Sequence, residues 1–238
     1  MHKPMALWST PRSASTAFDR MMRERGDHRV FTEPFSLAYY DGPDRVSTRF
    51  GAPAHAGPSY AEVWADVLGA ARYEPVFIKE MPHHLGPHLQ LDSLKRFRSS
   101  FLIRDPAWAV PSMLRIWDDA SDAELGYTAQ RKAFELLRAA GHTPVVVDAH
   151  DLRRHPAAVV AEWCKAMGID YVPQALSWKP GRPAGWNRWP QWFEHAATST
   201  GFAPPADGAP PAVPPEVDER IAPCRADYAV LYDERISV

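Results

Sequence analysis

The sequence predicts an α/β protein in which a central parallel β-sheet is flanked by helices. Short apolar segments of about five residues alternate along the chain with longer segments of helical periodicity. Most of the short segments are continuously apolar, which is typical of strands that are buried on both faces. The 238 residues are enough to bury a substantial core, and they contain no internal repeat.

Five strands are expected, and each is a short apolar run. In chain order the runs are PMALWS, HRVFTEPF, PVFIKE, SSFLIRDP and PVVVDAHDL, at residues 4–9, 28–35, 75–80, 99–106 and 144–152. Three of these runs carry a charged residue where the apolar part ends, namely Glu33, Lys79 and Arg104. Because ligands of open parallel sheets bind at the carboxyl ends of the strands, these three side chains are candidate site residues.

The helices expected between the strands carry apolar residues at helical spacing. They span residues 15–26, 59–73, 91–97, 107–117, 127–141 and 156–169. Gly26 can end the first helix, Ser59 can cap the second, and Pro156 suits the first turn of the last. Residues 41–59 are rich in Gly, Pro and Asp, and we expect them to form a loop.

Residues 1–202 are expected to form a single α/β domain, and a proline-rich linker is expected at 203–215. The segment 216–238 again carries apolar side chains at helical spacing. We therefore expect it to form a helix that packs back on the same domain.

Charge and composition exclude several classes of protein. The formal net charge of -2 provides no general attraction to nucleic acid or to an anionic membrane, so any anion site must be local. Cys164 and Cys224 form no disulfide framework and no metal-ligand pattern, which favours a reducing compartment. The first apolar run is too short for a signal peptide, and no run of about 18 apolar residues occurs. We expect a soluble, cytoplasmic protein.

The loop after the first strand, in TPRSASTAF, joins hydroxyl residues to one arginine. The N-terminus of the helix that follows offers unpartnered backbone N–H groups and a positive dipole, which together attract anions. Ser13, Ser15 and Thr16 add hydroxyl donors, and Arg12 adds a guanidinium. The alternative is an ordinary helix cap beside a solvated arginine. The loop lacks the GxxxxGK[ST] pattern, which argues against a nucleoside triphosphatase or ordinary kinase.

A second motif lies in FLIRDPAWAVPSM, where Arg104 follows an apolar strand and Ser112 lies eight residues later. A guanidinium and a hydroxyl are suitable partners for a terminal phosphate. The alternative is a surface ion pair between Arg104 and Asp105, with Ser112 an ordinary helix residue.

Together the two motifs resemble those of sulfotransferases that use 3'-phosphoadenosine 5'-phosphosulfate (PAPS). The first is similar to their 5'-phosphosulfate loop, written PRSGST or PKSGTT, and the second to their 3'-phosphate signature. The resemblance spans residues 5 to about 180. It implies a P-loop-like nucleotide-binding fold, PAPS as donor without a metal, and a donor site formed by Arg12, Ser13, Ala14, Ser15, Thr16, Arg104 and Ser112. Ala14 departs from the family pattern, because the family usually has glycine there and a Cβ restricts the approach of the backbone to a phosphate.

The resemblance also implies catalytic roles. Carboxylates at the place of Glu33 act as the base in tyrosylprotein and several bacterial carbohydrate sulfotransferases, and a lysine at the place of Lys79 contacts the sulfuryl group in the tyrosylprotein enzymes. We expect neighbouring apolar side chains to raise the pKa of Glu33. The alternatives are a surface glutamate and a strand-end lysine whose charged head reaches solvent.

Two further groups of residues are candidates. His83 and His84 compete with Glu33 as the base, since many cytosolic sulfotransferases use histidine, and no third ligand at suitable spacing suggests a metal. In the family, a late basic loop closes over the donor, and Lys179 and Arg182, near Arg188, match it loosely. The tryptophans around them are expected either to pack in the core or to line an acceptor pocket.

These motifs predict an enzyme that transfers a sulfuryl group from PAPS to a hydroxyl or amine of a small molecule. One alternative is a small-molecule kinase or another nucleotide-dependent transferase, against which the missing Walker lysine counts. The other is a non-catalytic phosphonucleotide-binding module, against which Glu33 and Lys79 count.

Overall fold

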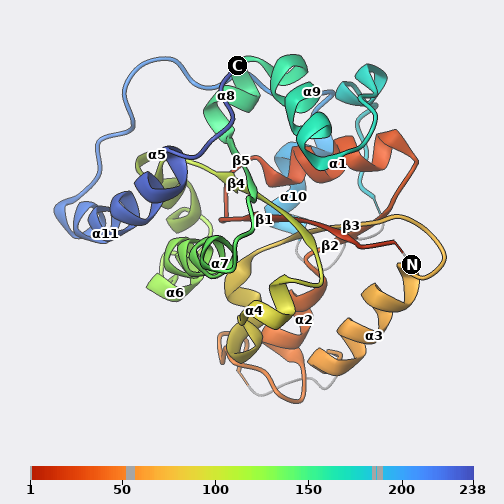
Figure 1. Ribbon diagram of the computed structural model, residues 1–238. Helices are drawn as coiled ribbons and strands as arrows, with labels where there is room; N and C mark the ends of the chain where they lie inside the picture. Colours follow the sequence, from red (N-terminus) through yellow and green to blue (C-terminus); the bar gives the residue numbers. More distant parts are fainter. Residues whose placement is uncertain (1, 52–56, 184–185, 187–189) are drawn as a thin grey trace.

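The computed structural model describes residues 2–51, 57–183, 186 and 190–238. A parallel sheet in the order β2-β3-β1-β4-β5 forms the centre of the molecule (Figure 1). Its strands are β1 (Met5–Ser9), β2 (Arg29–Thr32), β3 (Val76–Glu80), β4 (Arg98–Ile103) and β5 (Val145–Asp148). The predicted α/β class, with a parallel sheet between helices, is confirmed.

Each face of the sheet packs against its own set of helices. Met5 and Leu7 lie in the core formed with α1 (Ser15–Arg25) and α9 (Pro156–Met167). Ala6 and Trp8 point to the opposite face and lie in the core formed with α3 (Tyr60–Ala70) and α7 (Tyr127–Ala139). This alternation along a fully buried strand explains why β1 is a continuous apolar run. Figure 1 shows the two helical layers on opposite sides of the sheet.

Three predicted strands extend too far in sequence. The strand expected at 99–106 ends at Ile103, because Asp105 caps the helix α5 (Pro106–Leu114). The strand expected at 28–35 ends at Thr32, because Pro34 begins a helix, α2 (Pro34–Asp41), and its fixed φ suits a first helical position. The strand expected at 144–152 ends at Asp148, whose side chain accepts backbone N–H groups of α8 (Ala149–Arg154). The three errors have the same cause: a residue that starts or caps a helix follows within two positions of the strand end.

The remaining elements are short. They are η1 (Pro82–His88), α4 (Leu91–Leu94), α6 (Asp122–Leu125), η2 (Pro173–Leu176) and α10 (Pro190–Thr198). Of these, η1, α6, η2 and α10 have no counterpart in the sequence prediction. No helix in the described part of the chain is both long enough and apolar enough to span a lipid bilayer.

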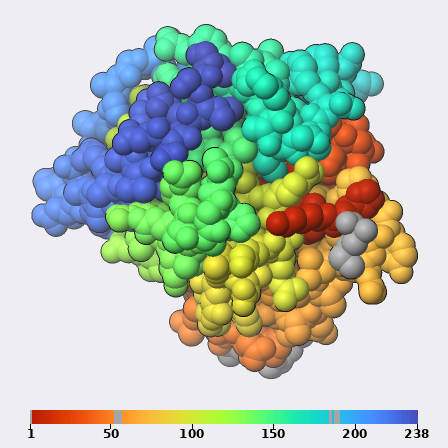
Figure 2. All heavy atoms as spheres, in the orientation of Figure 1, coloured from red at the N-terminus to blue at the C-terminus, as the bar shows by residue number. Residues whose placement is uncertain are grey.

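The C-terminal helix α11 (Pro215–Tyr232) lies against α5 and α7. Asp227 accepts a hydrogen bond from Thr128 at 2.8 Å and pairs with Arg131 at 3.3 Å, both on α7. Figure 2 shows this dark blue segment along the surface beside the green residues of α7. Beyond the helix, the amide of Ile236 donates to the Val146 carbonyl at the edge of the sheet.

The strand order places a topological switch point beside β1. The chain leaves β1 for β2 on one side of the sheet, returns through β3, and enters β4 on the other side of β1. Open α/β sheets bind ligands in the crevice at such a point, outside the carboxyl ends of the strands. The loop after β1 therefore lies where the fold favours a binding site.

Candidate active site

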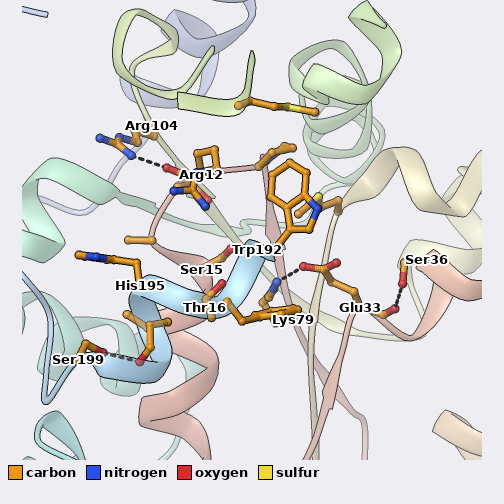
Figure 3. A pocket seen from close by; sticks show the side chains of 18 of the residues that line it. Arg12, Ser15, Thr16, Glu33, Ser36, Lys79, Arg104, Trp192, His195 and Ser199 are labelled. Carbon is orange, nitrogen blue, oxygen red and sulfur yellow. Dashed lines mark hydrogen bonds and ion pairs between the residues drawn. The ribbon is translucent and has the colours of Figure 1, made fainter. Parts of the chain in front are cut away.

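A cavity of about 320 Å³ lies at this switch point (Figure 3). The loop after β1, the ends of β2, β3 and β4, and helix α10 surround it. Ten residues singled out from the sequence line it: Arg12, Ser13, Ala14, Ser15, Thr16, Glu33, Lys79, His83, His84 and Arg104. The fold thus brings the two predicted motifs and the three predicted strand-end charges to one hollow.

The N-terminus of α1 is open towards this cavity. Its N-cap is Ala14, which adopts a left-handed conformation with φ 66° and provides no side-chain cap. The first N–H groups of a helix have no intrahelical partner, so an anion in the cavity can take the place of a cap. Arg12 is also left-handed, with φ 63°. Two non-glycine residues with left-handed backbone conformations strain the loop, and such strain is common at ligand-binding sites.

The hydroxyl groups of the loop divide into two kinds. Ser13 is buried, and its Oγ donates to the carbonyl of Thr10 at 2.7 Å. That bond braces the loop and leaves the Ser13 side chain without a donor for a ligand. Ser15 and Thr16, at the start of α1, line the cavity beside the helix N-terminus, as Figure 3 shows.

The two predicted motifs contact each other directly. Arg12 Nε donates to Ser112 Oγ at 3.0 Å, and an Arg104 nitrogen donates to the Arg12 carbonyl at 2.5 Å. Ser112 is not among the described residues that line the cavity, so it acts here by orienting Arg12. The alternative of an Arg104–Asp105 ion pair is wrong, because Asp105 caps α5 and Arg104 turns to the loop.

A third guanidinium, that of Arg153 on α8, joins Arg12 and Arg104 on the wall of the cavity. Within the described chain, none of the three has an acidic side chain within 4.0 Å. Burial and the neighbouring Arg153 charge lower the pKa of Arg104 to about 10. Burial, together with Arg115, also lowers the pKa of Arg12. The three guanidinium groups thus give this wall of the cavity a positive charge that no acidic side chain among the described residues balances.

The opposite wall of the cavity is electrically compensated. Lys79, almost wholly buried on β3, forms an ion pair with Glu33, which is left-handed at φ 48° between β2 and α2. Burial raises the pKa of Glu33, but the charges of Lys79 and His84 lower it more, and the net shift is downward. The prediction of a raised Glu33 pKa is therefore wrong. The desolvating neighbours of Glu33 were recognised in the sequence, whereas its pairing with Lys79, 46 positions away, was not.

Both candidate histidines are buried beside this ion pair. Burial lowers the pKa of His84 to about 4 and that of His83 well below its usual range. Both imidazoles are consequently neutral near pH 7.

An aromatic wall completes the cavity. Tyr40, Trp117 and Trp192 line it, and the rings of Trp117 and Trp192 meet edge to face at 4.8 Å. Behind them Arg49 stacks on Trp117 and binds both oxygens of Glu124 at 2.6 Å. Burial raises the pKa of Glu124, but the hydrogen bonds from Arg49 hold it at about 2.

Some tryptophans of the tryptophan-rich segment pack in the core, and one lines the cavity. Trp178 and Trp186 are buried, and Trp186 donates to Asp19 on α1 at 3.3 Å, whereas Trp192 lines the cavity. Helix α10 also brings His195 to the cavity, and the residue that follows the helix, Ser199, lines it as well (Figure 3). The sequence analysis did not single out these two residues, nor Arg153, because no local motif marks them.

Lys179 and Arg182 do not reach the site. Both are exposed, and neither is among the described residues that line the cavity. The backbone carbonyl of Lys179 accepts a hydrogen bond from Arg20 at 3.0 Å, on the outer side of α1. The structure thus does not support their predicted place in the donor site, and Arg153 supplies the extra cation instead. Arg188 lies outside the described residues.

The fold and the cavity define an α/β protein with a positively charged cavity at the first strand–helix junction. The family model of the sulfotransferase domain matches residues 3–225, and the chain belongs to that family. The predicted family and enzyme class, a transferase, are confirmed.

Solved sulfotransferase structures share this fold. The sulfotransferase domain of the olefin synthase from Synechococcus PCC 7002 aligns with a TM-score of 0.55 at 16% identity, over 92% of this chain and 94% of that one. The sulfotransferase domain of the curacin biosynthetic pathway aligns at 0.53 and 14% identity, over 94% and 97%. A sulfotransferase from Mycobacterium avium aligns at 0.51 and 14% identity, over 98% and 77%.

The chain is also similar to two curated proteins of Arabidopsis thaliana. These are the branched-chain-amino-acid aminotransferase-like proteins 2 and 1, each 27% identical over 207 and 209 residues. The match covers 83% of this chain and 36% of each relative, so the chain spans about a third of their length.

Proposed function

We propose that the protein transfers a sulfuryl group from PAPS to a hydroxyl or amine of a small molecule. The observation that carries this proposal is the group of three guanidinium groups without acidic partners, beside an open helix N-terminus at the switch point of the sheet. Such a group is suited to a ligand with more than one anionic centre. PAPS, a nucleotide with a 5'-phosphosulfate and a separate 3'-phosphate, is such a ligand.

The residues present fit this donor. Ser15, Thr16 and the N-terminus of α1 would hold the 5'-phosphosulfate, with Arg12 beside them. Arg104, reinforced by Arg153, would hold the 3'-phosphate. Because Arg104 is hydrogen-bonded to the backbone of Arg12, the two anion sites are adjacent parts of one surface. The loop has no lysine of the kind that holds the outer phosphates of a nucleoside triphosphate, which counts against a kinase.

Transfer requires that the acceptor oxygen or nitrogen attack sulfur while the bond from sulfur to the 5'-phosphate oxygen breaks. Lys79 would stabilise negative charge at the transferring group, as cations do in phosphoryl transfer. The acceptor loses one proton, and either Glu33 or His84 can receive it. The products are the sulfated acceptor and 3'-phosphoadenosine 5'-phosphate.

The aromatic wall indicates the kind of acceptor. On this side of the cavity Glu33 is paired with Lys79 and Glu124 with Arg49, so the wall presents rings and little net charge. We propose an uncharged, aromatic or apolar small molecule as acceptor, and neither nucleic acid nor a membrane as partner. Cys164 and Cys224 are free and buried, which supports a cytoplasmic location.

Calorimetric titration tests the donor. The protein should bind 3'-phosphoadenosine 5'-phosphate at least about tenfold more tightly than ATP or AMP, a difference of about 1.4 kcal/mol. AMP is the matched control, since it differs only by the 3'-phosphate. Tighter binding of ATP would overturn the proposal.

A further inference from the structure

Glu80 is a buried carboxylate for which the proposed function has no role. It ends β3, one residue beyond Lys79, and is wholly inaccessible to solvent. Its Oε2 accepts the amide N–H of Phe35 at 2.7 Å, and its Oε1 accepts that of Met81 at 2.7 Å. Oε1 also lies 2.7 Å from Nδ1 of His84. An isolated buried charge is costly, so a carboxylate kept at this position needs an explanation.

The hydrogen-bond network determines which atom holds the shared proton. Burial and the charge of Glu33 raise the pKa of Glu80 well above its usual value, whereas the two backbone N–H groups that its oxygens accept favour the ionised carboxylate. On the geometry of these two amide contacts we assign a hydrogen bond in which His84 Nδ1 donates to the Glu80 carboxylate. The other nitrogen, Nε2, then carries a lone pair and has no partner among the described residues.

The ring of His84 is held firmly at the cavity wall. The Tyr60 hydroxyl donates to its backbone carbonyl at 2.9 Å. The rings of Tyr39 and Tyr40 lie 5.5 Å from its centroid, and that of His83 lies 4.2 Å away. Since Nδ1 faces Glu80, Nε2 is the nitrogen left for the cavity that His84 lines.

Glu33, the other main candidate for the base, is already paired with a cation. The Glu33 carboxylate is paired with Lys79, and accepting a proton would remove the charge that holds Lys79 in place. His83 has no oriented partner either, because its buried Nδ1 makes no hydrogen bond. Of the three, His84 alone combines a fixed ring orientation with a free lone pair.

We propose that Glu80 is a positioning residue that holds His84 with Nδ1 protonated, so that His84 Nε2 is the base of the reaction and Glu33 positions Lys79. This inference rests on the proposed function. The acceptor O–H or N–H bond breaks, its proton moves to Nε2, and its electron pair forms the bond to sulfur. The electrons of the broken sulfur–oxygen bond remain on the departing 5'-phosphate. The imidazolium formed is stabilised by the Glu80 carboxylate behind it, by the same arrangement as in serine-protease triads.

Nitrogen-15 NMR of the histidine side chains tests the proton assignment without any turnover. The His84 signals are identified by their loss in His84→Gln. In the wild-type protein at pH 7, Nδ1 should be the protonated nitrogen and Nε2 the unprotonated one. Glu80→Gln should shift this signal towards the other tautomer, whereas Glu135→Gln, at an exposed glutamate, should leave it unchanged. A wild-type His84 protonated on Nε2 would overturn the proposal.

Kinetics test the role of His84 and Glu80 in the reaction. The assay follows release of 3'-phosphoadenosine 5'-phosphate from PAPS with 2-naphthol as acceptor. If 2-naphthol is not a substrate, the assay follows hydrolysis of PAPS, in which water is the acceptor. We expect His84→Gln to lower kcat about 100-fold or more, and Glu80→Gln about 10- to 100-fold. The double variant should be no slower than His84→Gln alone, because the two residues act as a unit. Independent, multiplying losses would contradict the proposal.

The pH profile separates positioning from mere support of the fold. The titratable groups that face His84 are Glu33, Tyr39, Tyr40, Tyr60, Lys79, Glu80, His83 and Glu124. If His84 is the base, kcat falls on the acid side. The fall should shift to lower pH in Glu80→Gln, because the imidazolium loses its carboxylate, and should persist in Glu33→Gln. An acid limb that survives in His84→Gln and disappears in Glu33→Gln would assign the base to Glu33.

The two proposals can fail separately. If calorimetry detects no binding of 3'-phosphoadenosine 5'-phosphate to the wild-type protein, the proposed function is wrong. If the protein binds 3'-phosphoadenosine 5'-phosphate and transfers sulfuryl, but Glu80→Gln changes neither the His84 tautomer nor the pH dependence of kcat, only this inference is contradicted.

Discussion

The two walls of the cavity differ in how their charges are balanced. On the wall of the loop after β1, Arg12, Arg104 and Arg153 have no acidic partners in the described chain. On the opposite wall Lys79 is paired with Glu33, and Glu124 with Arg49. The first wall thus carries positive charge without acidic partners, whereas the charges of the second wall are paired within the protein.

Because of this difference, substitutions on the two walls should have different consequences. A cation without a partner contributes to ligand affinity and little to folding, since it repels its neighbours until the ligand arrives. A buried ion pair contributes to the integrity of the fold, because removing one partner leaves the other charge uncompensated. Substitutions of the unpaired cations should therefore lower ligand affinity, and substitutions in the buried ion pair should lower folding stability.

The largest effect is expected from Lys79→Met, which keeps the length of the side chain and removes its charge. Loss of one partner from a buried pair costs about 3–5 kcal/mol, and urea denaturation should show a decrease of this size. The double variant Lys79→Met/Glu33→Gln should recover much of it. Lys165→Met is the control, because its pair with Glu162 is exposed and should change stability by about 0.5 kcal/mol or less. A loss below about 1 kcal/mol for Lys79→Met would mean that the compensated wall does not support the fold.

The same contrast explains what could be predicted from the sequence. The candidate site residues Arg12 to Thr16 form one continuous stretch before a helix, and Arg104 lies at the end of an apolar strand. Helix termini and strand ends are local features, so these residues could be assigned before any tertiary contact was known. The five strands were predicted for the same reason, and the errors at Pro34, Asp105 and Asp148 are confined to their ends.

The compensated wall could not be predicted in this way. Arg49 and Glu124 are 75 positions apart, and nothing in the sequence near either marks the pair. Glu80 was adjacent to a recognised residue, Lys79, yet its role depends on amides supplied by Phe35 and Met81 in the folded chain. Arg153 reaches the cavity only because α8 replaces the predicted end of a strand. These features arise from the packing of strands and helices.

The second prediction concerns the uncompensated wall. Arg104→Ala should weaken binding of 3'-phosphoadenosine 5'-phosphate by about 1.5–3 kcal/mol, roughly 10- to 150-fold, through loss of a charged hydrogen bond. Its unfolding free energy should change by about 1 kcal/mol or less, because relief of repulsion from Arg153 offsets the lost bond to the Arg12 carbonyl.

Arg138→Ala is the control for this substitution, since Arg138 lies on α7 in an exposed pair with Glu234. It should leave donor binding unchanged in the same calorimetric titration. A stability loss for Arg104→Ala as large as that for Lys79→Met would remove the distinction between the two walls.

The smallest effect is expected at Ala14, the left-handed N-cap of α1. A Cβ in this conformation costs about 1–2 kcal/mol in the folded state, whereas glycine costs about 0.4–1 kcal/mol through the greater freedom of the unfolded chain. Ala14→Gly should therefore leave stability unchanged or raise it by about 1 kcal/mol at most. Ala161→Gly, within α9, has no strain to relieve and should lose about 0.5–1 kcal/mol. Donor affinity should rise less than tenfold, because glycine lets the loop backbone approach the phosphate. Equal losses at both positions would show that the loop holds Ala14 without strain and that only its charges, not its backbone conformation, prepare this wall for an anion.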